Sequence, residues 1–356
     1  MTRSLNAGYN RTNVRISQVK HRAFYYVLKF MRNTAPSLSK RMIKKLFFTP
    51  AKRKMTSQEK DCLASGTAFK ISIHNQTVQC WKWGRGPGIL LVHGWNGRGI
   101  HLHRYIEPFV LAGHSVITFD SPGHGLSQGE TSSYFEFTDT VRFFLKSGIS
   151  YNIQGVIAHS LGASAVINGI VKENCPVNAV LIAPALRLRE ILFDAFDGFG
   201  VPRQIYQCLI KEYEDQFGYD FDRDNPYHLL KEMNSQIVIV HDKNDHTIPY
   251  ADSKKAAETF QNISFYTTEG LGHKRIMSDP SVVDLIINAI CRSNSREDKE
   301  MMSITSIVKE YREADHEKRL HLFLECPSLR RRFIEIDQGE FRPLTSDQAP
   351  VSAIHS

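Results

Sequence analysis

Short runs of apolar residues recur from residue 67 to residue 268, and they are of two kinds. In the first kind, at 67–73 and 77–83, apolar and polar side chains alternate, which predicts a β-hairpin around the turn His74-Asn75-Gln76. The second kind is continuously apolar and alternates with helical stretches, as is typical of a parallel sheet buried on both faces. Its strands are expected at 88–94, 115–120, 153–160, 178–184, 236–242 and 262–268.

One connection in this pattern is much longer than the others. No strand is expected between Pro184 and Asn234, a segment rich in aromatic and acidic residues. Connections of this length in a compact domain usually carry structure of their own or a function. We therefore expect a short helical cap inserted at about residues 185–234.

Helical patterns also flank the predicted sheet. Residues 22–31 and 41–48 are amphipathic, with Pro36 between them and Pro50 after them. After the sheet, the pattern predicts a polar linker, two helical pieces whose apolar surface needs a partner (the protein body or another chain), and a disordered tail. The expected domains are a basic helical arm at 1–60, an α/β core at 61–292, the linker at 293–302, a helical C-terminal extension at 303–338 and the tail at 339–356.

The bulk composition is that of a soluble globular protein, with 42% hydrophobic and 23% charged residues in a chain of 356. No stretch reaches the roughly 20 apolar residues of a membrane span, and the N-terminus lacks the pattern of a secretory signal. The cysteines at 62, 80, 175, 208, 291 and 326 show no metal-site or disulfide spacing, so we expect thiols in a reducing compartment. The expected localisation is therefore cytoplasmic.

The net charge of +8 is unevenly distributed. Residues 1–54 contain 14 Lys and Arg and no acid, so the remaining 31 basic and 37 acidic side chains give a mildly negative body of −6. This arm has three interpretations: a packed helix pair, peripheral attachment to an anionic membrane, or a mitochondrial transit peptide. It carries no nucleic-acid recognition motif, so we expect no nucleic-acid partner.

The strongest local signal for chemistry is Ala158-His159-Ser160-Leu161-Gly162, between a buried strand and a helix rich in small residues. A nucleophile on a sharp strand-to-helix turn needs small neighbours, because the strand and the helix approach closely there. The same turn points the hydroxyl at the N–H groups that begin the helix. The backbone N–H of Leu161, with that of Trp95 in the loop after residues 88–94, is expected to form an oxyanion hole.

The run 120–127 (DSPGHGLS), together with His93-Gly94-Trp95 and the serine turn, resembles the α/β-hydrolase family over about residues 60–292. The sequences LFFTPAKRK and WKWGRGPGILLVHGW are also similar to a group of uncharacterised bacterial hydrolases. The family begins its serine motif with Gly where this chain has Ala158. The resemblance implies an α/β-hydrolase fold, that is, a mostly parallel central sheet flanked by helices, with the cap and the terminal helices as additions to it.

The same resemblance implies the partners of Ser160. The run 241–249 (HDKNDHTIP) matches the family's acid loop at Asp245, and 269–273 (EGLGH) matches its histidine loop at His273. Asp242 is the alternative acid, although its place at a strand end favours a structural role. His273 would then be the general base, and Asp245 would orient it.

Other polar residues have simpler interpretations. His93, His124 and Asp120 are expected to shape the loops around the site. His159 and Trp95 are candidates for the pocket wall, although a packed histidine is an equally good interpretation of His159. His101 and His103 lack further ligands, so we expect neither a metal nor a cofactor.

Three functional hypotheses follow. The first is a serine hydrolase that cleaves a carboxylic ester or thioester through an acyl-enzyme on Ser160. The second is an acyltransferase, or a C–C or amide hydrolase, on the same three residues. The third is a non-catalytic binding module, which the intact set of serine, acid and histidine disfavours.

Overall fold

The computed structural model describes residues 26–31, 33–52, 54–146, 151–294, 310–311, 313–316, 318–319 and 337. Four predicted segments lie wholly or mostly outside these residues. They are the start of the arm, most of the linker at 293–302, most of the C-terminal extension at 303–338 and the whole tail at 339–356. The predictions for those segments stay predictions.

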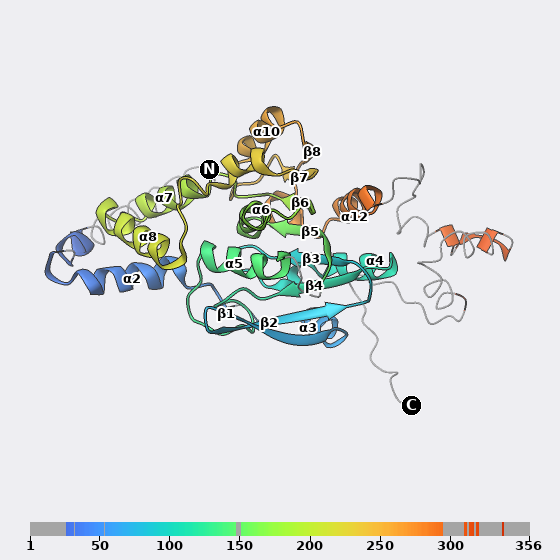
Figure 1. Cartoon of the computed structure of the whole chain (residues 1–356), viewed down its shortest axis with the longest axis horizontal. Helices are drawn as coiled ribbons and strands as arrows, with labels where there is room; N and C mark the ends of the chain where they lie inside the picture. The colour runs from blue at the N-terminus through green and yellow to red at the C-terminus, as the bar shows by residue number, and fades with distance from the viewer. Residues whose placement is uncertain are drawn as a thin grey trace, which may run out of the picture.

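Eight strands of the described chain form one mostly parallel sheet in the order β1-β2-β4-β3-β5-β6-β7-β8, with helices on both sides (Figure 1). The strands β1 and β2 form an antiparallel hairpin, β2 also pairs antiparallel with β4, and β3 to β8 run parallel. This arrangement confirms the predicted fold. The strands are β1 Thr67–Ile73, β2 Gln76–Trp83, β3 Gly88–Val92, β4 Ser115–Phe119, β5 Ile153–His159, β6 Asn178–Ile182, β7 Ile237–Asp242 and β8 Ile263–Thr268.

The central strands are buried on both faces, and β3 shows why its sequence does not alternate. Leu90 and Val92 belong to a cluster with residues of α5 (Tyr134–Leu145) and α6 (Leu161–Glu173) on one face. Ile89 and Leu91 pack with residues of α4 (Ile106–Leu111) and α12 (Pro280–Asn294) on the other. Each of these side chains is fully buried, which contributes roughly 1.5–3 kcal/mol per residue. A strand that faces apolar helices on both sides must therefore be apolar throughout.

The flanking helices follow the strands in an α/β order. They are α4 Ile106–Leu111, α5 Tyr134–Leu145, α6 Leu161–Glu173, α7 Leu188–Gly198, α8 Arg203–Phe217, α9 Pro226–Leu229, α10 Tyr250–Thr259, α11 Gly272–Arg275 and α12 Pro280–Asn294, with 3₁₀ turns η1 Gly99–Tyr105 and η2 Leu230–Glu232. No helix in the described part of the chain is long and apolar enough to cross a membrane.

The first hairpin has a shorter turn than expected. Gln76 pairs with Ile73, which leaves two residues in the turn instead of three. His74 and Asn75 both have positive φ, 47° and 61°, as a two-residue hairpin turn requires to match the twist of its strands. Asparagine tolerates this conformation better than most residues, so the signal was present in the sequence.

The arm differs from the expected pair of helices in its boundaries. Helix α2 spans Pro36–Phe48, five residues longer than the amphipathic stretch 41–48, because proline is well suited to the first turn of a helix. Residues 26–31, the described part of the expected 22–31 helix, are also helical.

A further helix, α3 Ser57–Ala64, lies across the expected boundary between arm and core at residue 60 and was not predicted. Thr56 and Glu59 form a capping box at its start. The sequence of α3 has no apolar residues at helical spacing, so the hydrophobic pattern alone could not predict this helix.

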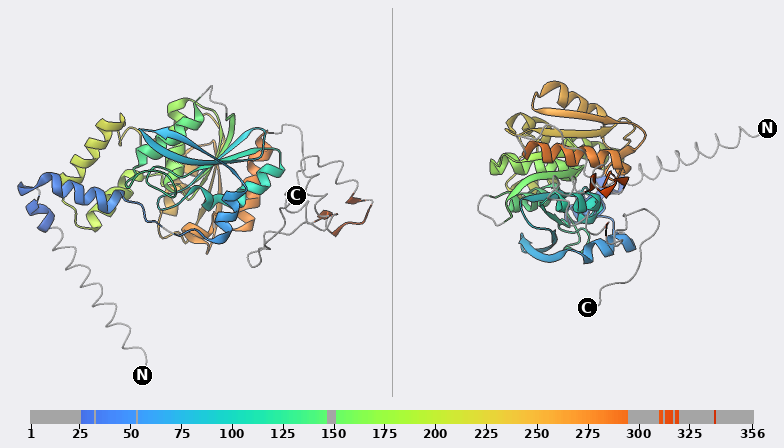
Figure 2. Two further views of the ribbon diagram at one scale, coloured as in Figure 1. Left: turned by 90° about the horizontal axis from the view of Figure 1, so that it is seen from below. Right: turned by 90° about the vertical axis from the view of Figure 1, so that its right-hand side faces the viewer.

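Helices α7 and α8 lie within the insertion expected at 185–234. They lie beside α2 at one end of the molecule (Figure 2). The contact is aromatic: the ring of Phe47 lies 4.4 Å from that of Phe196, and Phe48 stacks on Tyr213 at 4.9 Å. The arm and the insertion therefore share one packed layer.

Candidate active site

Ser160 sits on a strained turn between β5 and α6. Its φ is 55° and its ψ is −120°, a conformation that costs a non-glycine residue on the order of 1–3 kcal/mol. Small neighbours make the turn possible. A Cβ atom on Gly162 would lie 2.2 Å from the carbonyl oxygen of His93, and one on Gly94 would lie 3.0 Å from the Cβ of Ser160. Ala158, which replaces the usual glycine, is fully buried in the apolar cluster beneath the turn.

The structure brings Ser160, His273 and Asp245 together although they come from three separate loops. The Ser160 Oγ lies 3.1 Å from Nε2 of His273, and Nδ1 of His273 lies 2.7 Å from Oδ2 of Asp245. Because the carboxylate can only accept, Nδ1 carries the proton and Nε2 is left to accept from the serine hydroxyl. The side chain of Asp245 is fully buried and that of His273 is 11% exposed.

Asp245 is held as a carboxylate. Its Oδ1 accepts the backbone N–H groups of Thr247 at 2.7 Å and Ile248 at 3.0 Å, in a turn immediately after β7. Burial alone would raise the pKa of Asp245, but hydrogen bonds from His241, His273 and these N–H groups outweigh it, so the pKa is far below its usual range. The group is therefore a carboxylate at neutral pH.

A histidine that the sequence analysis did not single out completes this cluster. His241, near the end of β7, is fully buried; its Nε2 lies 3.2 Å from Oδ2 of Asp245 and its Nδ1 lies 2.7 Å from the hydroxyl of Ser253. One carboxylate oxygen thus accepts from two imidazoles. The signal for it was a histidine directly after four apolar residues of a strand and four residues before Asp245.

Asp242, the alternative acid, has a different place. Its carboxylate accepts from the hydroxyl of Thr268 at 2.7 Å, the N–H of Leu271 at 2.9 Å and the N–H of Asn244 at 2.9 Å. Burial acts to raise the pKa of Asp242, but these hydrogen bonds lower it overall. Asp242 therefore holds the loop that carries His273, as its strand-end position favoured, and makes no hydrogen bond to His273 itself.

The two N–H groups expected to form an oxyanion hole border the same space as the serine. Trp95 and Leu161 both line the cavity into which Ser160 opens. Within the described chain, no hydrogen bond uses the backbone N–H of either residue. Their role as an oxyanion hole stays a prediction.

The loop that carries Trp95 is anchored at several points. His93 donates from Nδ1 to the Gly94 carbonyl at 2.8 Å and accepts at Nε2 from the Ser121 N–H at 3.0 Å, which requires a neutral ring. Burial lowers the pKa of His93 well below its usual value, consistent with this role. Asp120 accepts the N–H groups of Gly99 and Leu126, both at 2.8 Å, and so ties two loops together.

The cavity beside Ser160 has a volume of about 310 Å³, within the usual range for small-molecule sites. Its wall is almost entirely apolar and contains no charged side chain. The lining residues are Phe47, Phe48, Trp95, Ser133, Tyr134, Phe135, Ser160, Leu161, Ala185, Leu188, Ile191, Leu192, Ala195, Ile210, Phe221, Thr247 and Ile248. They come from the core, from α2 and from the insertion.

The two residues predicted for the pocket wall, Trp95 and His159, lie in different places. Trp95 lines the cavity, but His159 is not among its lining residues. The Nε2–H of His159 donates to the carbonyl of His273 at 2.9 Å, and the two rings lie 4.6 Å apart. Burial and the neighbouring His273 lower the pKa of His159 to about 3, so the ring stays neutral and acts as a packed support.

His101 and His103 do not converge on a common centre. His101 lies 3.5 Å from Glu59, and Nδ1 of His103 bonds to the carbonyl of Ile100. Among the residues that the structure describes, no group of three or more His, Cys, Asp or Glu is arranged to hold a metal ion.

The strand order, the single hairpin at the antiparallel edge and the serine turn after β5 define an α/β-hydrolase fold. The chain belongs to the alpha/beta hydrolase family, whose model matches residues 89–284. The match begins at β3 and ends in α12, so it includes all three loops of the candidate site but neither the arm nor α3.

Among solved structures, the chain is similar to the esterase Pf2001 of Pyrococcus furiosus in several crystal forms. One form is 18% identical with a TM-score of 0.53, covering 68% of this chain and 96% of the esterase. Another is 17% identical with a TM-score of 0.54, covering 70% and 98%. Likeness at this identity shows the fold alone. A comparison with curated protein sequences gives no significant match.

Proposed function

We propose that this hydrolase cleaves carboxylic esters or thioesters with an apolar acyl group, through an acyl-enzyme on Ser160. The observation that carries the proposal is the continuous hydrogen-bonded set of Ser160, His273 and Asp245 at the edge of an apolar cavity. A hydroxyl is a poor nucleophile at neutral pH unless a base accepts its proton. The arrangement supplies such a base in the correct tautomer.

In the first half of the reaction, Oγ of Ser160 attacks the acyl carbon while its proton moves to Nε2 of His273. Asp245 stabilises the imidazolium that forms. The N–H groups of Trp95 and Leu161 donate to the developing oxyanion. The bond to the leaving oxygen or sulfur then breaks, and His273 returns the proton to the departing alcohol or thiol.

In the second half, water takes the place of the leaving group. His273 removes a proton from the water, whose oxygen attacks the acyl-enzyme carbon. The bond to Oγ then breaks, the serine regains its proton from His273, and the acid product leaves. No metal or cofactor enters either half.

The cavity wall supports the apolar acyl group. Burying a charged acyl group among these side chains without a partner would be costly, whereas each buried methylene contributes about 0.8 kcal/mol. An acyl chain of aliphatic or aromatic character is therefore the substrate class that fits the space beside Ser160.

Replacement of the serine tests this proposal directly. We expect Ser160→Ala to lower kcat for p-nitrophenyl esters by a factor on the order of 10⁶, as loss of the nucleophile does in serine proteases, and to abolish labelling by a fluorophosphonate probe. Ser72→Ala, on an exposed position of β1, is the matched control and should retain both. Full activity or labelling in Ser160→Ala would reject the assignment.

A further inference from the structure

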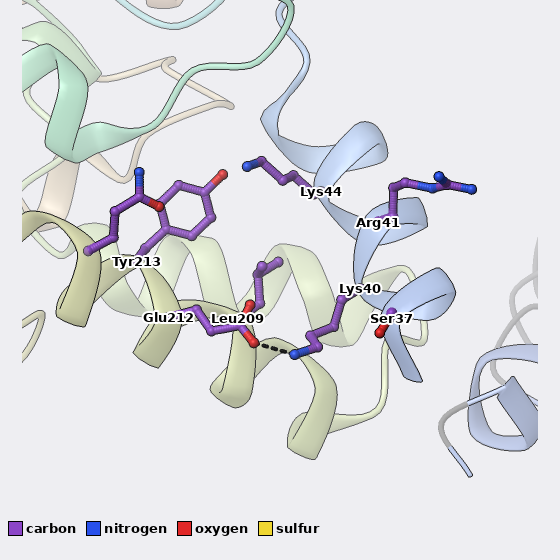
Figure 3. Close-up of a pocket in the computed structure, with 8 residues that line it drawn as sticks. Ser37, Lys40, Arg41, Lys44, Leu209, Glu212 and Tyr213 are labelled. Carbon is purple, nitrogen blue, oxygen red and sulfur yellow. Dashed lines mark hydrogen bonds and ion pairs between the residues drawn. The ribbon is translucent and has the colours of Figure 1, made fainter. Parts of the chain in front are cut away.

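Helix α2 presents two different faces. Its inner face is buried: Ser39, Ile43 and Phe48 pack toward the protein. Figure 3 shows this side of the helix against α8, with Lys40 paired to Glu212 and Lys44 directed toward Tyr213. The inner face thus packs against the insertion, as the packed-helix interpretation of the arm expects.

The outer face is apolar and is only partly covered by the described residues. Leu38, Met42 and Leu46 recur every four residues, so they form one stripe along the helix, and they are 42%, 37% and 49% exposed. Tyr26, Val27 and Phe30 in the preceding helical turns are exposed as well. Together these are six of the nine large apolar side chains that the described structure exposes.

Positive charge flanks this stripe. Arg41, Lys45 and Lys52 are exposed, and none of them has an acidic partner within the described chain. Arg41 points away from α8 in Figure 3. The three basic residues line a groove of about 630 Å³ together with Leu38 and Met42. One acidic residue, Glu130, also lines this groove.

We propose that the outer face of α2 attaches this protein peripherally to an anionic phospholipid surface. An apolar stripe bordered by Lys and Arg is the pattern of a helix that lies in the plane of a membrane interface, where the apolar side chains enter the acyl boundary and the cations meet the headgroups. The basic groove is complementary to phosphate charge. A protein partner would have to supply both a matching apolar surface and acids.

The position of α2 gives this attachment a consequence for catalysis. The last turn of the helix supplies Phe47 and Phe48 to the wall of the cavity beside Ser160. A membrane bound to α2 would therefore lie one helix away from the acyl cavity. An ester held in that membrane is then the favoured substrate. This preference rests on the proposed esterase function, whereas the attachment to the membrane does not.

Vesicle sedimentation with the full-length protein tests the attachment. We expect binding to vesicles of equal parts phosphatidylcholine and phosphatidylglycerol, and little binding to phosphatidylcholine alone. The triple variant Arg41→Gln/Lys45→Gln/Lys52→Gln should lower the partition coefficient by a factor on the order of 100, since each cation near an anionic surface contributes a severalfold gain. Leu38→Ser/Met42→Ser/Leu46→Ser should lower it as well, at unchanged charge.

A matched control removes the same charge elsewhere. Lys211, Lys254 and Lys255 are exposed on α8 and α10, and their triple replacement by Gln should leave vesicle binding near the wild-type value. Both α2 variants should hydrolyse a soluble p-nitrophenyl ester at the wild-type rate, which shows that they are folded. Ser160→Ala should bind vesicles as the wild type does, so that loss of catalysis and loss of attachment are separate results.

Three results would overturn the proposal. They are equal binding to neutral and anionic vesicles, unchanged binding in both α2 variants, and a loss of binding in the control triple equal to that in the α2 triple. A change of mass by light scattering in the leucine and methionine variant, with lipid binding intact, would instead identify a second copy of this chain as the occupant of the face.

Discussion

At the scale of single residues, the serine turn depends on the absence of a side chain at Gly162 as much as on the hydroxyl of Ser160. Ser160 keeps its positive φ because α6 can approach β3 closely at Gly162. Of the residues in the motif 158–162, Gly162 is thus constrained by backbone contact, whereas Ala158 shows that the first position accepts a methyl group.

This difference predicts opposite outcomes for two glycine substitutions. In Gly162→Ala, the new Cβ would lie 2.2 Å from the His93 carbonyl oxygen, which is fixed backbone, so the turn must shift. We expect a loss of about 1–3 kcal/mol in unfolding free energy, together with a loss of ester hydrolysis. Gly198→Ala, at the end of α7 with nothing within 4 Å, should leave stability unchanged or raise it slightly. Equal unfolding midpoints for the two variants would contradict this explanation.

His241 acts through Asp245, and its role can be separated from a purely structural one. In His241→Leu the carboxylate loses one donor, a hydrogen bond to a charged group that contributes about 1.5–3 kcal/mol. We expect kcat to fall roughly tenfold or more while KM changes little, because the orientation of His273 is affected and the cavity is not. His241→Gln, which keeps a donor at the position of Nε2, should recover part of the loss. Identical losses in the two variants would show that packing alone is responsible.

At the scale of elements, α2 is the part of the chain that links the arm to the chemistry. It lies outside the region that the family model matches, yet it contributes two rings to the cavity wall. The composition of the arm suggested a surface role, and its amphipathic pattern suggested a helix. Neither property could show that the helix ends against the space beside Ser160.

This placement predicts a change in acyl-chain selectivity. Phe47→Ala removes a partly buried ring from the cavity wall, so the preferred p-nitrophenyl ester should shift toward longer acyl chains, visible as a change in kcat/KM across a chain-length series. Phe143→Ala, which removes a ring of similar burial on α5 away from the cavity, should keep the wild-type preference. A parallel loss at every chain length in Phe47→Ala would indicate lost stability and not a larger cavity.

At the scale of the whole molecule, several histidines are buried as neutral rings around the sheet edge. Burial lowers the pKa of His124 to about 4 and, with the neighbouring His273, that of His159 to about 3. In the unfolded chain a histidine takes up a proton near pH 6.5. Between these values the unfolded state binds more protons than the folded state, so acidification favours unfolding.

We therefore expect the unfolding free energy to decrease as the pH falls from about 6.5 to 4, with His124 contributing about 3 kcal/mol of the change. Denaturant titrations across this range measure the slope. His124→Asn should flatten it by about one proton, whereas His246→Asn, at an exposed position, should not. A wild-type slope in His124→Asn would contradict the assignment of a buried neutral ring.

By itself, the sequence determined the class of the fold and the order of the chemical groups along the chain. Continuously apolar strands are buried on both sides only in a sheet that helices cover on both faces. Ser160, Asp245 and His273 each follow one of the predicted strands. Since parallel strands end at one edge, their loops had to meet there. The local pattern thus placed the loops, and the resemblance to the α/β-hydrolase family identified Asp245 and His273 within them.

The tertiary structure decided what depends on contacts between distant loops. It placed Asp245 and not Asp242 against His273, because the turn after β7 directs one carboxylate outward and the other back to Thr268 and Leu271. It added His241 as a second donor and put the rings of α2 into the cavity wall. These outcomes depend on distances of a few ångströms between segments far apart in sequence, which no local pattern of apolar and polar residues records.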